Sequence, residues 1–327
     1  MDGGSRRSKT RVFVLGAGAS KSCGLPLTNE LFPEVLPKVA PRSRLLELIE
    51  YLYPHFRLSW RNYPRFEEFL SLLDVHLEFN PKVKRRHLFG NTEVQELKES
   101  LLSAVSRHLC DLVSGVDIRN KQMFRLAQEL GPRDVVITFN WDTTLELALN
   151  ELGRARDFSY VLTSKYMSLL KPHGSVDWYD SQNVRLKKDR VFSLIPGIGR
   201  IKVFEYFSFP HVQEQLVPVI VPPVIHKTFE YREFDRIWRD SWKALRRADE
   251  IYVIGFSLPP EDLHIRFVMR TAIRANEIER SRSDALRVVV VNPDRDVYLR
   301  FARLVVSKVR YLEAGFEDVS LDEIRGK

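Results

Sequence analysis

The chain has 327 residues, of which 44% are hydrophobic and 29% are charged, and its formal net charge is +8 at pH 7. These values are typical of a globular protein with a sizeable core, and they exclude a disordered or low-complexity chain. No run of about 20 apolar residues is present, as a membrane-spanning helix would need. The N-terminus, MDGGSRRSKT, has no signal-peptide apolar region. We therefore expect a cytoplasmic protein with no membrane contact.

The cysteines and the basic residues limit the choice of metal and partner. Cys23 and Cys110 are far apart in the sequence and form no CxxC pair, so they predict neither a zinc site nor a disulfide framework. The positive net charge is compatible with a nucleic-acid partner, but the basic residues are dispersed. Their densest short cluster is KVKRR at residues 82–86. We expect nucleic acid to be reached only through a partner.

The first predicted element is a buried strand, VFVL at residues 12–15, which runs into a turn of small residues and then a helix. Such a turn lets backbone N–H groups approach a pyrophosphate. A glycine turn is also common where a strand and the following helix simply pack closely together. Lys21 replaces the third glycine of a dinucleotide fingerprint, and no ribose-binding carboxylate follows roughly 20 residues later, so a dehydrogenase is disfavoured. The turn consists of Gly16, Ala17, Gly18, Ala19 and Ser20.

The stretch at residues 27–131 is predicted to be helical. Apolar residues recur there at steps of three and four, as in Leu97, Leu101 and Val105, and prolines divide the stretch into several helices. We interpret it as a helical insertion after the first strand of a single domain, whose core comprises residues 10–26 and 132–327. An insertion at this place is positioned to cap the mouth of a nucleotide site.

The second core strand is predicted at residues 134–138 and is followed by Asn140 and Asp142. Ligands bind at the carboxyl ends of strands in open α/β sheets, which makes Asn140 a functional candidate. For Asp142, two interpretations have similar weight. It is either a functional residue at the strand end or a helix N-cap, because aspartate is common just before a helix. We expect Asn140 to orient water or the ribose of a ligand, and Asp142 to favour a developing positive charge or to hold the loop.

A third strand, predicted at residues 167–171, leads to Pro172, His173 and Gly174. Histidine suits general base catalysis near neutral pH, and we expect the glycine to leave room beside its ring. Further strands are predicted around residues 191–195, 203–207, 250–257, 286–291 and 307–311, with polar residues at the ends of two of them, Ser257 and Asn292. The alternation predicts a doubly wound, mostly parallel Rossmann-like α/β sheet.

As an ordered set, these motifs resemble the sirtuin superfamily, specifically the SIR2-like NADase domains of bacterial anti-phage defence systems. GAGAS with GLP at residues 24–26 is similar to the first nucleotide motif of the family, TFNWD at residues 138–142 to its T-x-N-x-D motif, and His173-Gly174 to its catalytic histidine motif. Gly255, Ser257 and Asn292 match the elements that hold the adenosine half of NAD. The resemblance implies that Asn140, His173 and Asp142 form the catalytic set and that NAD is the substrate.

Two departures from protein-deacylating sirtuins favour the NADase branch. The chain cannot build the four-cysteine zinc module of those enzymes, and Phe139 stands where their T-Q-N motif has glutamine. The resemblance implies hydrolysis of NAD⁺ to nicotinamide and ADP-ribose without zinc, by a domain that is activated in a homo-oligomer or by a protein partner. An NAD-dependent protein deacylase and a non-catalytic NAD or ADP-ribose sensor remain the alternatives.

Overall fold

The structure, a computed structural model, describes residues 9–79, 89–181, 191–204, 217–221, 231–260, 262–280 and 285–326. Within them a seven-stranded sheet has the order β10-β9-β8-β1-β2-β4-β3, and every neighbouring pair is parallel. The predicted doubly wound, mostly parallel α/β sheet is therefore confirmed. The strands are β1 (Arg11–Leu15), β2 (Val135–Thr138), β3 (Phe158–Ser159), β4 (Met167–Leu170), β8 (Glu250–Ile254), β9 (Arg287–Val291) and β10 (Val309–Leu312).

The central strands are buried on both faces, as the apolar runs predict. The residues Val12 to Leu15 of β1 are at most 2% exposed, because helices cover both faces of a parallel sheet. Helices α6 and α7 pack against each other, as do α8 and α9, and right-handed crossovers put these two pairs on opposite faces. The helices outside the segment between α1 and α6 are α1 (Ala17–Lys21), α6 (Gln122–Glu129), α7 (Thr144–Glu151), α8 (Arg232–Arg247), α9 (Leu263–Glu279), α10 (Arg295–Ala302) and, after the last strand, α11 (Leu321–Arg325).

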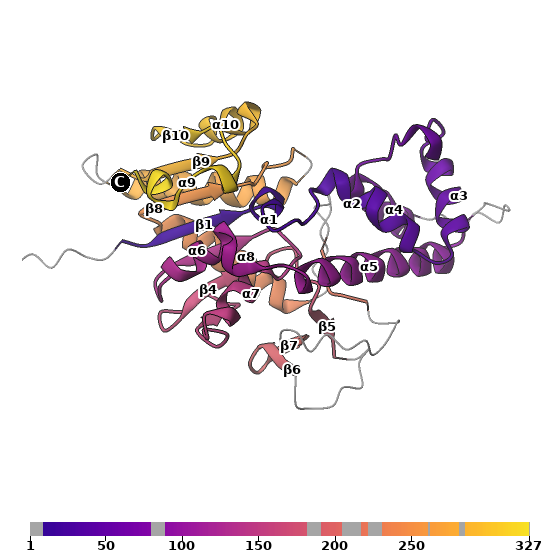
Figure 1. The fold of residues 1–327 in the computed structure, drawn as a ribbon, viewed down its shortest axis with the longest axis horizontal. Coiled ribbons are helices and arrows are strands. Elements are labelled where there is room, and N and C mark those ends of the chain that lie inside the picture. Colours follow the sequence, from indigo (N-terminus) through magenta and orange to yellow (C-terminus); the bar gives the residue numbers. More distant parts are fainter. Residues whose placement is uncertain are drawn as a thin grey trace, which may run out of the picture.

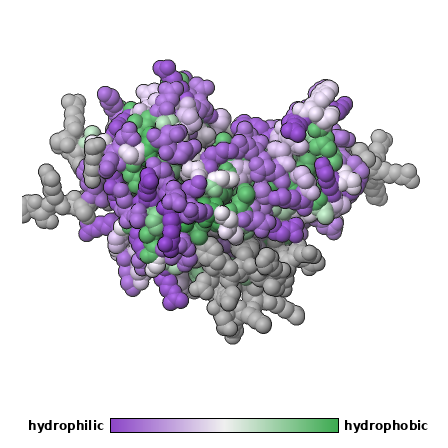
Figure 2. All heavy atoms as spheres, in the orientation of Figure 1, coloured by the Kyte–Doolittle hydropathy of each residue, from purple (hydrophilic) through white to green (hydrophobic). Residues whose placement is uncertain are grey.

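Every described element between α1 and α6 is helical, and most of this segment forms a lobe beside the sheet (Figure 1). The long helix α5 returns from the lobe toward the sheet, burying positions such as Val94, Leu97, Leu101 and Val105. In the same view the surface is mostly hydrophilic, with hydrophobic side chains gathered between the sheet and the lobe (Figure 2). The lobe contains α2 (Thr28–Val35), α3 (Arg42–Leu52), α4 (Phe66–Phe79) and α5 (Asn91–Ser114).

The strands expected at residues 191–195 and 203–207 do not join the parallel sheet. They belong to an antiparallel three-stranded sheet, β5-β7-β6, formed by β5 (Trp178–Asp180), β6 (Val191–Ile195) and β7 (Ile198–Phe204). A two-residue turn connects β6 to β7, which requires antiparallel pairing. The rest of the second expected strand, residues 205–207, and the basic cluster at residues 82–86 lie outside the described residues. None of the described helices is long and apolar enough to cross a membrane.

The chain builds the sheet in two directions from β1. It proceeds through β2, β4 and β3 on one side, and later through β8, β9 and β10 on the other. The order therefore reverses between β1 and β8, which is the place where open α/β sheets form their ligand crevice. The turn after β1 and the turn after β8 meet there, so that Gly18 N–H donates to the Gly255 carbonyl at 2.9 Å.

Three glycines make this meeting possible. A Cβ added to Gly16 would lie 2.5 Å from Phe256 Cα, and one added to Gly18 would lie 2.7 Å from Gly255 Cα. Gly255 has φ +61°, and its Cβ would lie 2.3 Å from Ala19 N. The two turns therefore pack backbone against backbone, with no space for a side chain on either one.

Substitution of Gly255 by alanine should destabilise the fold by roughly 2–5 kcal/mol, since it adds a backbone clash to the strain of a left-handed conformation. Gly153→Ala is the matched control, because Gly153 has φ +71° but nothing within 4 Å of its added Cβ. It should cost only about 1–2 kcal/mol. Urea unfolding of both variants measures the difference. Equal losses would show that the contact between the two turns is not a close one.

Candidate functional site

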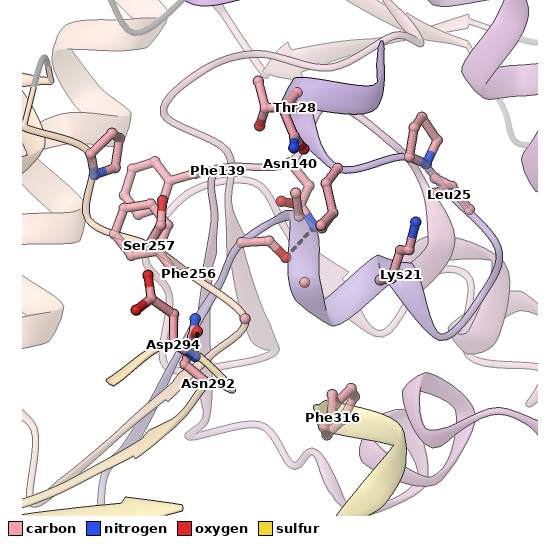
Figure 3. A pocket seen from close by; sticks show the side chains of 18 of the residues that line it. Lys21, Leu25, Thr28, Phe139, Asn140, Phe256, Ser257, Asn292, Asp294 and Phe316 are labelled. Atoms are coloured by element: carbon pink, nitrogen blue, oxygen red, sulfur yellow. Dashed lines mark hydrogen bonds between the residues drawn. The ribbon is translucent and has the colours of Figure 1, made fainter. Parts of the chain in front are cut away.

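A cavity of about 590 Å³ lies at the carboxyl end of the parallel sheet (Figure 3). Its volume is within the range of small-molecule sites, about 300–1,000 Å³. Its wall includes the turns after β1 and β8, the loop after β2, and the ends of β4 and β9. The lobe contributes Thr28, Asn29 and Leu31 of α2, Glu67 of α4 and Leu109 of α5, so the helical segment closes one side of the cavity.

Most of the residues singled out in the sequence reach this cavity. Ala19 and Ser20 are the exceptions; both are buried behind the wall, at 0% and 1% exposure. Ser20 acts through Asn140 instead, as described below. The predicted residues that line the cavity are Gly16, Ala17, Gly18, Asn140, Asp142, His173, Gly255, Ser257 and Asn292.

The backbone amides of the turn after β1 are mostly committed to other backbone groups. Gly16 N–H donates to the Ile254 carbonyl at 3.1 Å, and Ala19 N–H donates to the Gly16 carbonyl at 2.8 Å. Gly18 N–H is used in the contact with Gly255 described above. The Ala17 N–H, at the start of α1, is not among these bonds. The sequence predicted that these amides would cradle a phosphate, whereas three of them hold the turn to β8 and close α1.

Asn140 is fixed by the same turn. Its Nδ2 donates to the Gly16 carbonyl at 2.9 Å and to Ser20 Oγ at 2.9 Å, so both amide hydrogens are used within the protein. Ser20 Oγ lies 3.2 Å from Thr144 Oγ1, which connects it to the start of α7. This arrangement leaves the Asn140 Oδ1 as the polar atom available to a ligand, and that atom is a hydrogen-bond acceptor.

Asp142 also holds the loop, although the N-cap of α7 is Thr143 and not Asp142 as the capping interpretation expected. Its Oδ1 accepts from Thr144 N–H at 3.0 Å and from Thr144 Oγ1 at 2.6 Å. A side chain that accepts from the first helical N–H satisfies one of the donors that a helix start leaves open. Asp142 lines the cavity but is only 8% exposed. Its bonds to Thr144 identify it as the residue that anchors the loop to α7.

His173 lines the cavity and is 4% exposed. Its Nε2 is 2.9 Å from Asp262 Oδ2, and the Asp262 side chain is fully buried at the start of α9. The tautomer that donates Nε2–H to this carboxylate carries its lone pair on Nδ1. Asp262 was not predicted as a site residue, because no sequence pattern shows that the start of α9 lies next to the loop after β4.

Aromatic rings surround this histidine. The Phe139 ring stacks on Phe256 with centroids 4.7 Å apart, and it meets His173 edge-on at 5.1 Å. The Trp238 ring lies 6.0 Å from the histidine ring. Phe139 and Phe256 also line the cavity. On this side His173 is therefore surrounded by aromatic rings, whose low polarity strengthens the electrostatic interactions of the imidazole.

The loop that carries His173 is tied to the loop that carries Asn140. Lys171 Nζ donates to the Asp142 carbonyl at 2.7 Å, and Ser175 Oγ and Val176 N–H donate to the Trp141 carbonyl at 3.2 and 3.0 Å. These three bonds fix the relative position of the two candidate catalytic side chains. No motif in the sequence signalled them.

The loop that carries His173 requires glycine at position 174. It has φ +77°, and an added Cβ would lie 2.0 Å from the Val219 carbonyl oxygen. Val221 N–H donates to the His173 carbonyl at 2.9 Å, so the segment at residues 217–221 runs directly beside the histidine loop. The glycine was expected to leave room beside the ring. It leaves room for the backbone of Val219 instead.

A buried charge cluster lies beneath the two loops. Lys171 is 0% exposed, and its Nζ donates to Glu146 Oε1 at 2.9 Å. Asp177 is 3% exposed, with no donor in hydrogen-bonding geometry among the described residues. Burial raises the pKa of both carboxyls, although the charge of Lys171 acts in the opposite direction. With one cation and two carboxyls, the cluster is neutral when one carboxyl keeps its proton.

The far end of the cavity is formed by the ends of β9 and β10. Asn292 follows β9, and its Oδ1 accepts from Asp294 N–H at 2.9 Å, which leaves its amide hydrogens for other partners. Phe316 and Glu317, which follow β10, also line the cavity. The sequence analysis did not predict these last two, because they follow the strand by several residues and form no recognisable motif.

The described residues contain no group of three or more His, Cys, Asp or Glu side chains placed to hold a metal ion. Cys23 and Cys110 are both buried free thiols. Burial raises the pKa of the Cys23 thiol to about 11, so this side chain is a neutral packing group near pH 7.

No protein-family model matches the chain, and no curated protein matches its sequence. Among solved structures, it is similar to a Sir2 homologue in complex with NAD, with 14% identity over 97% of this chain and 89% of the other and a TM-score of 0.45. It is also similar to a mutant Sir2 homologue in complex with 2′-O-acetyl ADP-ribose, with 14% identity, 97% and 90% coverage and a TM-score of 0.45. A third similar structure is Sir2Tm bound to a propionylated peptide, with 14% identity, 97% and 90% coverage and a TM-score of 0.40.

The buried cluster predicts a pH dependence of stability. The folded-state pKa of Asp177 lies above its unfolded value, about 3.9, so the contribution of Asp177 to stability falls as the pH rises from that value. Asp177→Asn leaves the neutral Lys171–Glu146 pair. Its free energy of unfolding relative to wild type should therefore increase with pH, by up to about 1.4 kcal/mol per unit. Urea unfolding at pH 5, 6.5 and 8 measures this trend.

Asp157→Asn serves as the control for the loss of one negative charge, because the Asp157 side chain is 57% exposed. If the free energies of unfolding of Asp177→Asn and wild type differ by the same amount at every pH, the cluster does not retain a proton.

Proposed function

We propose that the chain is an NAD⁺ glycohydrolase of the SIR2-like type, which cleaves the bond between nicotinamide and ribose to give nicotinamide and ADP-ribose. The observation that carries this proposal is the sharing of one cavity by Asn140, His173 and the turn after β1. The same cavity extends to Asn292 at the end of β9, on the other side of the strand-order reversal. Its extent across the sheet suits a dinucleotide.

The cleavage needs few catalytic groups. Nicotinamide leaves as a neutral molecule when the C1′–N bond breaks and its electron pair passes to the pyridinium nitrogen, so the leaving group needs no general acid. The ribose then has oxocarbenium character, as in glycoside hydrolysis. Water adds to C1′ and loses one proton. The protein must position the ribose and a single water molecule and accept that proton.

The geometry suggests a role for each side chain. Asn140 presents Oδ1, because its Nδ2 is held by the Gly16 carbonyl and Ser20, and this acceptor suits a water molecule or a ribose hydroxyl. His173 accepts the proton of water, and the Asp262 carboxylate 2.9 Å from its Nε2 stabilises the imidazolium that forms. Asp142 holds the loop through Thr144. The rings of Phe139 and Phe256 limit access of bulk water.

An NAD-dependent protein deacylase is the alternative within the same chemistry. Phe139 disfavours it: a ring stacked on Phe256 lines the cavity where the deacylases have a polar glutamine. The two activities differ in their requirement for a peptide. Nicotinamide and ADP-ribose released in equal amounts without peptide support the hydrolase. Nicotinamide released only with an acyl-lysine peptide, one molecule per deacylation, supports the deacylase.

A role in anti-phage defence belongs to the same proposal, as does activation through a homo-oligomer or a protein partner in the cytoplasm. Both are supported by the sequence resemblance described above. Binding of ADP-ribose is the property to measure first, because it needs the cavity but not the activated state. Tight ADP-ribose binding without turnover, even in the assembled state, would favour a sensor over an enzyme.

Asn140→Ala and His173→Ala should each lower nicotinamide release by at least about 100-fold, because each removes a group that positions or deprotonates the attacking water. Chromatographic measurement of nicotinamide and ADP-ribose, with circular dichroism as the test of folding, decides the outcome. Leu263→Ala, at a residue of α9 that is 51% exposed and outside the cavity wall, is the control. Folded Asn140→Ala and His173→Ala proteins that hydrolyse NAD at the wild-type rate would refute the assignment.

Asp262→Asn tests the carboxylate behind the histidine. Asp262 Oδ1 accepts from Ile265 N–H at 3.1 Å at the start of α9, and asparagine caps helices as well as aspartate does. We expect an unchanged unfolding midpoint, an unchanged KM for NAD, and a kcat lowered by roughly 10²–10⁴-fold, because the imidazolium loses its counter-charge. A kcat within threefold of wild type would show that the carboxylate only caps the helix.

A further inference from the structure

The residue that takes the place of the third fingerprint glycine lies on the cavity wall. Lys21 is the last residue of α1, and its side chain is 42% exposed. The third glycine of a dinucleotide fingerprint serves close packing between helix and strand, and an exposed lysine does not pack in that way. Its position in the wall therefore needs another explanation.

Helix geometry places this lysine on the cavity face of α1. Ala17 and Lys21 are four residues apart, so they share one face of α1, and both line the cavity. Side chains on a helix tend to lean toward its N-terminus, so the Gly16–Gly18 side is within the range of Lys21 rotamers, although its ammonium group is paired with Glu30. Figure 3 shows Lys21 among the side chains that surround the cavity, near Leu25.

The turn itself offers little to an anion. Three of its amides donate to backbone carbonyls, as described above, and α1 has five residues, which is too short for a substantial macrodipole. The wall also contains the carboxylates of Asp294 and Glu317. A pyrophosphate with two negative charges therefore favours a side-chain cation near the turn. The described wall has two cationic side chains, Lys21 and Arg65. Lys21 belongs to α1, which begins at the turn, whereas Arg65 precedes α4 of the lobe.

The ammonium group of Lys21 is presently paired outside the cavity. Its Nζ is 2.5 Å from Glu30 Oε2, on α2, and Glu30 is not a wall residue. The hydrogen bond from Lys21, together with that from the Leu27 N–H, lowers the pKa of the Glu30 carboxyl. This pair is exposed, and exposed ion pairs contribute only about 0–1 kcal/mol. A phosphate can therefore attract Lys21 away from Glu30 at low cost.

We propose that Lys21 is the cation that binds the pyrophosphate of the dinucleotide, in place of a backbone amide cradle, and that Glu30 holds it when the cavity has no anion. The inference rests on the proposed function, since it assumes a dinucleotide in the cavity. It adds a binding residue that the family motifs do not include. It also explains why a charged side chain replaces a glycine at this position.

Calorimetric titration of the full chain with ADP-ribose tests the proposal, with adenosine as the probe that lacks phosphate. Lys21→Gln should weaken ADP-ribose binding about tenfold, the loss of one charge-assisted contact, and should leave adenosine binding within twofold of wild type. Lys21→Arg should restore most of the affinity. Glu30→Gln should bind ADP-ribose at least as tightly as wild type, because it frees the ammonium group.

Lys98→Gln is the matched control, because Lys98 pairs with Asp74 in the lobe and lies outside the cavity wall. Unchanged ADP-ribose affinity in Lys21→Gln would overturn the proposal. So would an equal loss of adenosine and ADP-ribose binding, which would indicate a damaged wall. A Glu30→Gln variant as weak as Lys21→Gln would also overturn it. Failure of the wild-type protein to bind ADP-ribose would instead refute the proposed function itself.

Discussion

The contact between two backbone turns at the point where the strand order reverses is the constraint on which the rest of the site depends. Gly16 and Gly18 after β1 meet Gly255 after β8 without intervening side chains. The contact consumes amides that a nucleotide-binding turn usually offers to phosphate. It also sets the position of the Gly16 carbonyl, which in turn fixes the Asn140 amide. Packing at the centre of the sheet thus determines which polar atom faces the ligand.

A second set of contacts fixes the positions of the candidate catalytic side chains relative to each other. Lys171 and Ser175 bind the carbonyls of the Asn140 loop, and Asp262 reaches His173 from the start of α9. Lys171 lies in the strand-end segment that leads to His173, so its charge is buried where it can hold both loops. A buried cation is tolerated there because Glu146 accepts its hydrogen bond. Structural and catalytic roles are thus divided between neighbouring residues, and the polar groups beneath the loops never reach the cavity.

Comparison of the sequence with the structure separates two kinds of candidate residue. Asn140, His173, Ser257 and Asn292 were predicted because they follow apolar runs, and all four line one cavity. Ser20 and Ala19 belong to the same motif as Gly16 yet lie behind the wall. A turn motif specifies the spacing of its residues along the chain. Whether each residue faces the cavity or the protein interior depends on how the turn packs. Asp142 lines the cavity and also accepts a hydrogen bond from the first residue of α7.

The sequence by itself determined the parallel sheet, the helical segment after its first strand and the residues at the strand ends. Runs of β-branched residues bounded by glycine and proline are local signals, and parallel strands necessarily collect their carboxyl ends on one edge. Only the tertiary structure decided the partners of those residues. The pairing of β5 with β7, the Asp262–His173 pair and the Lys171 contacts join segments whose separation in the chain carries no periodic signal. Such pairings depend on the packing of the whole domain, because each buried polar group must find its partner in three dimensions.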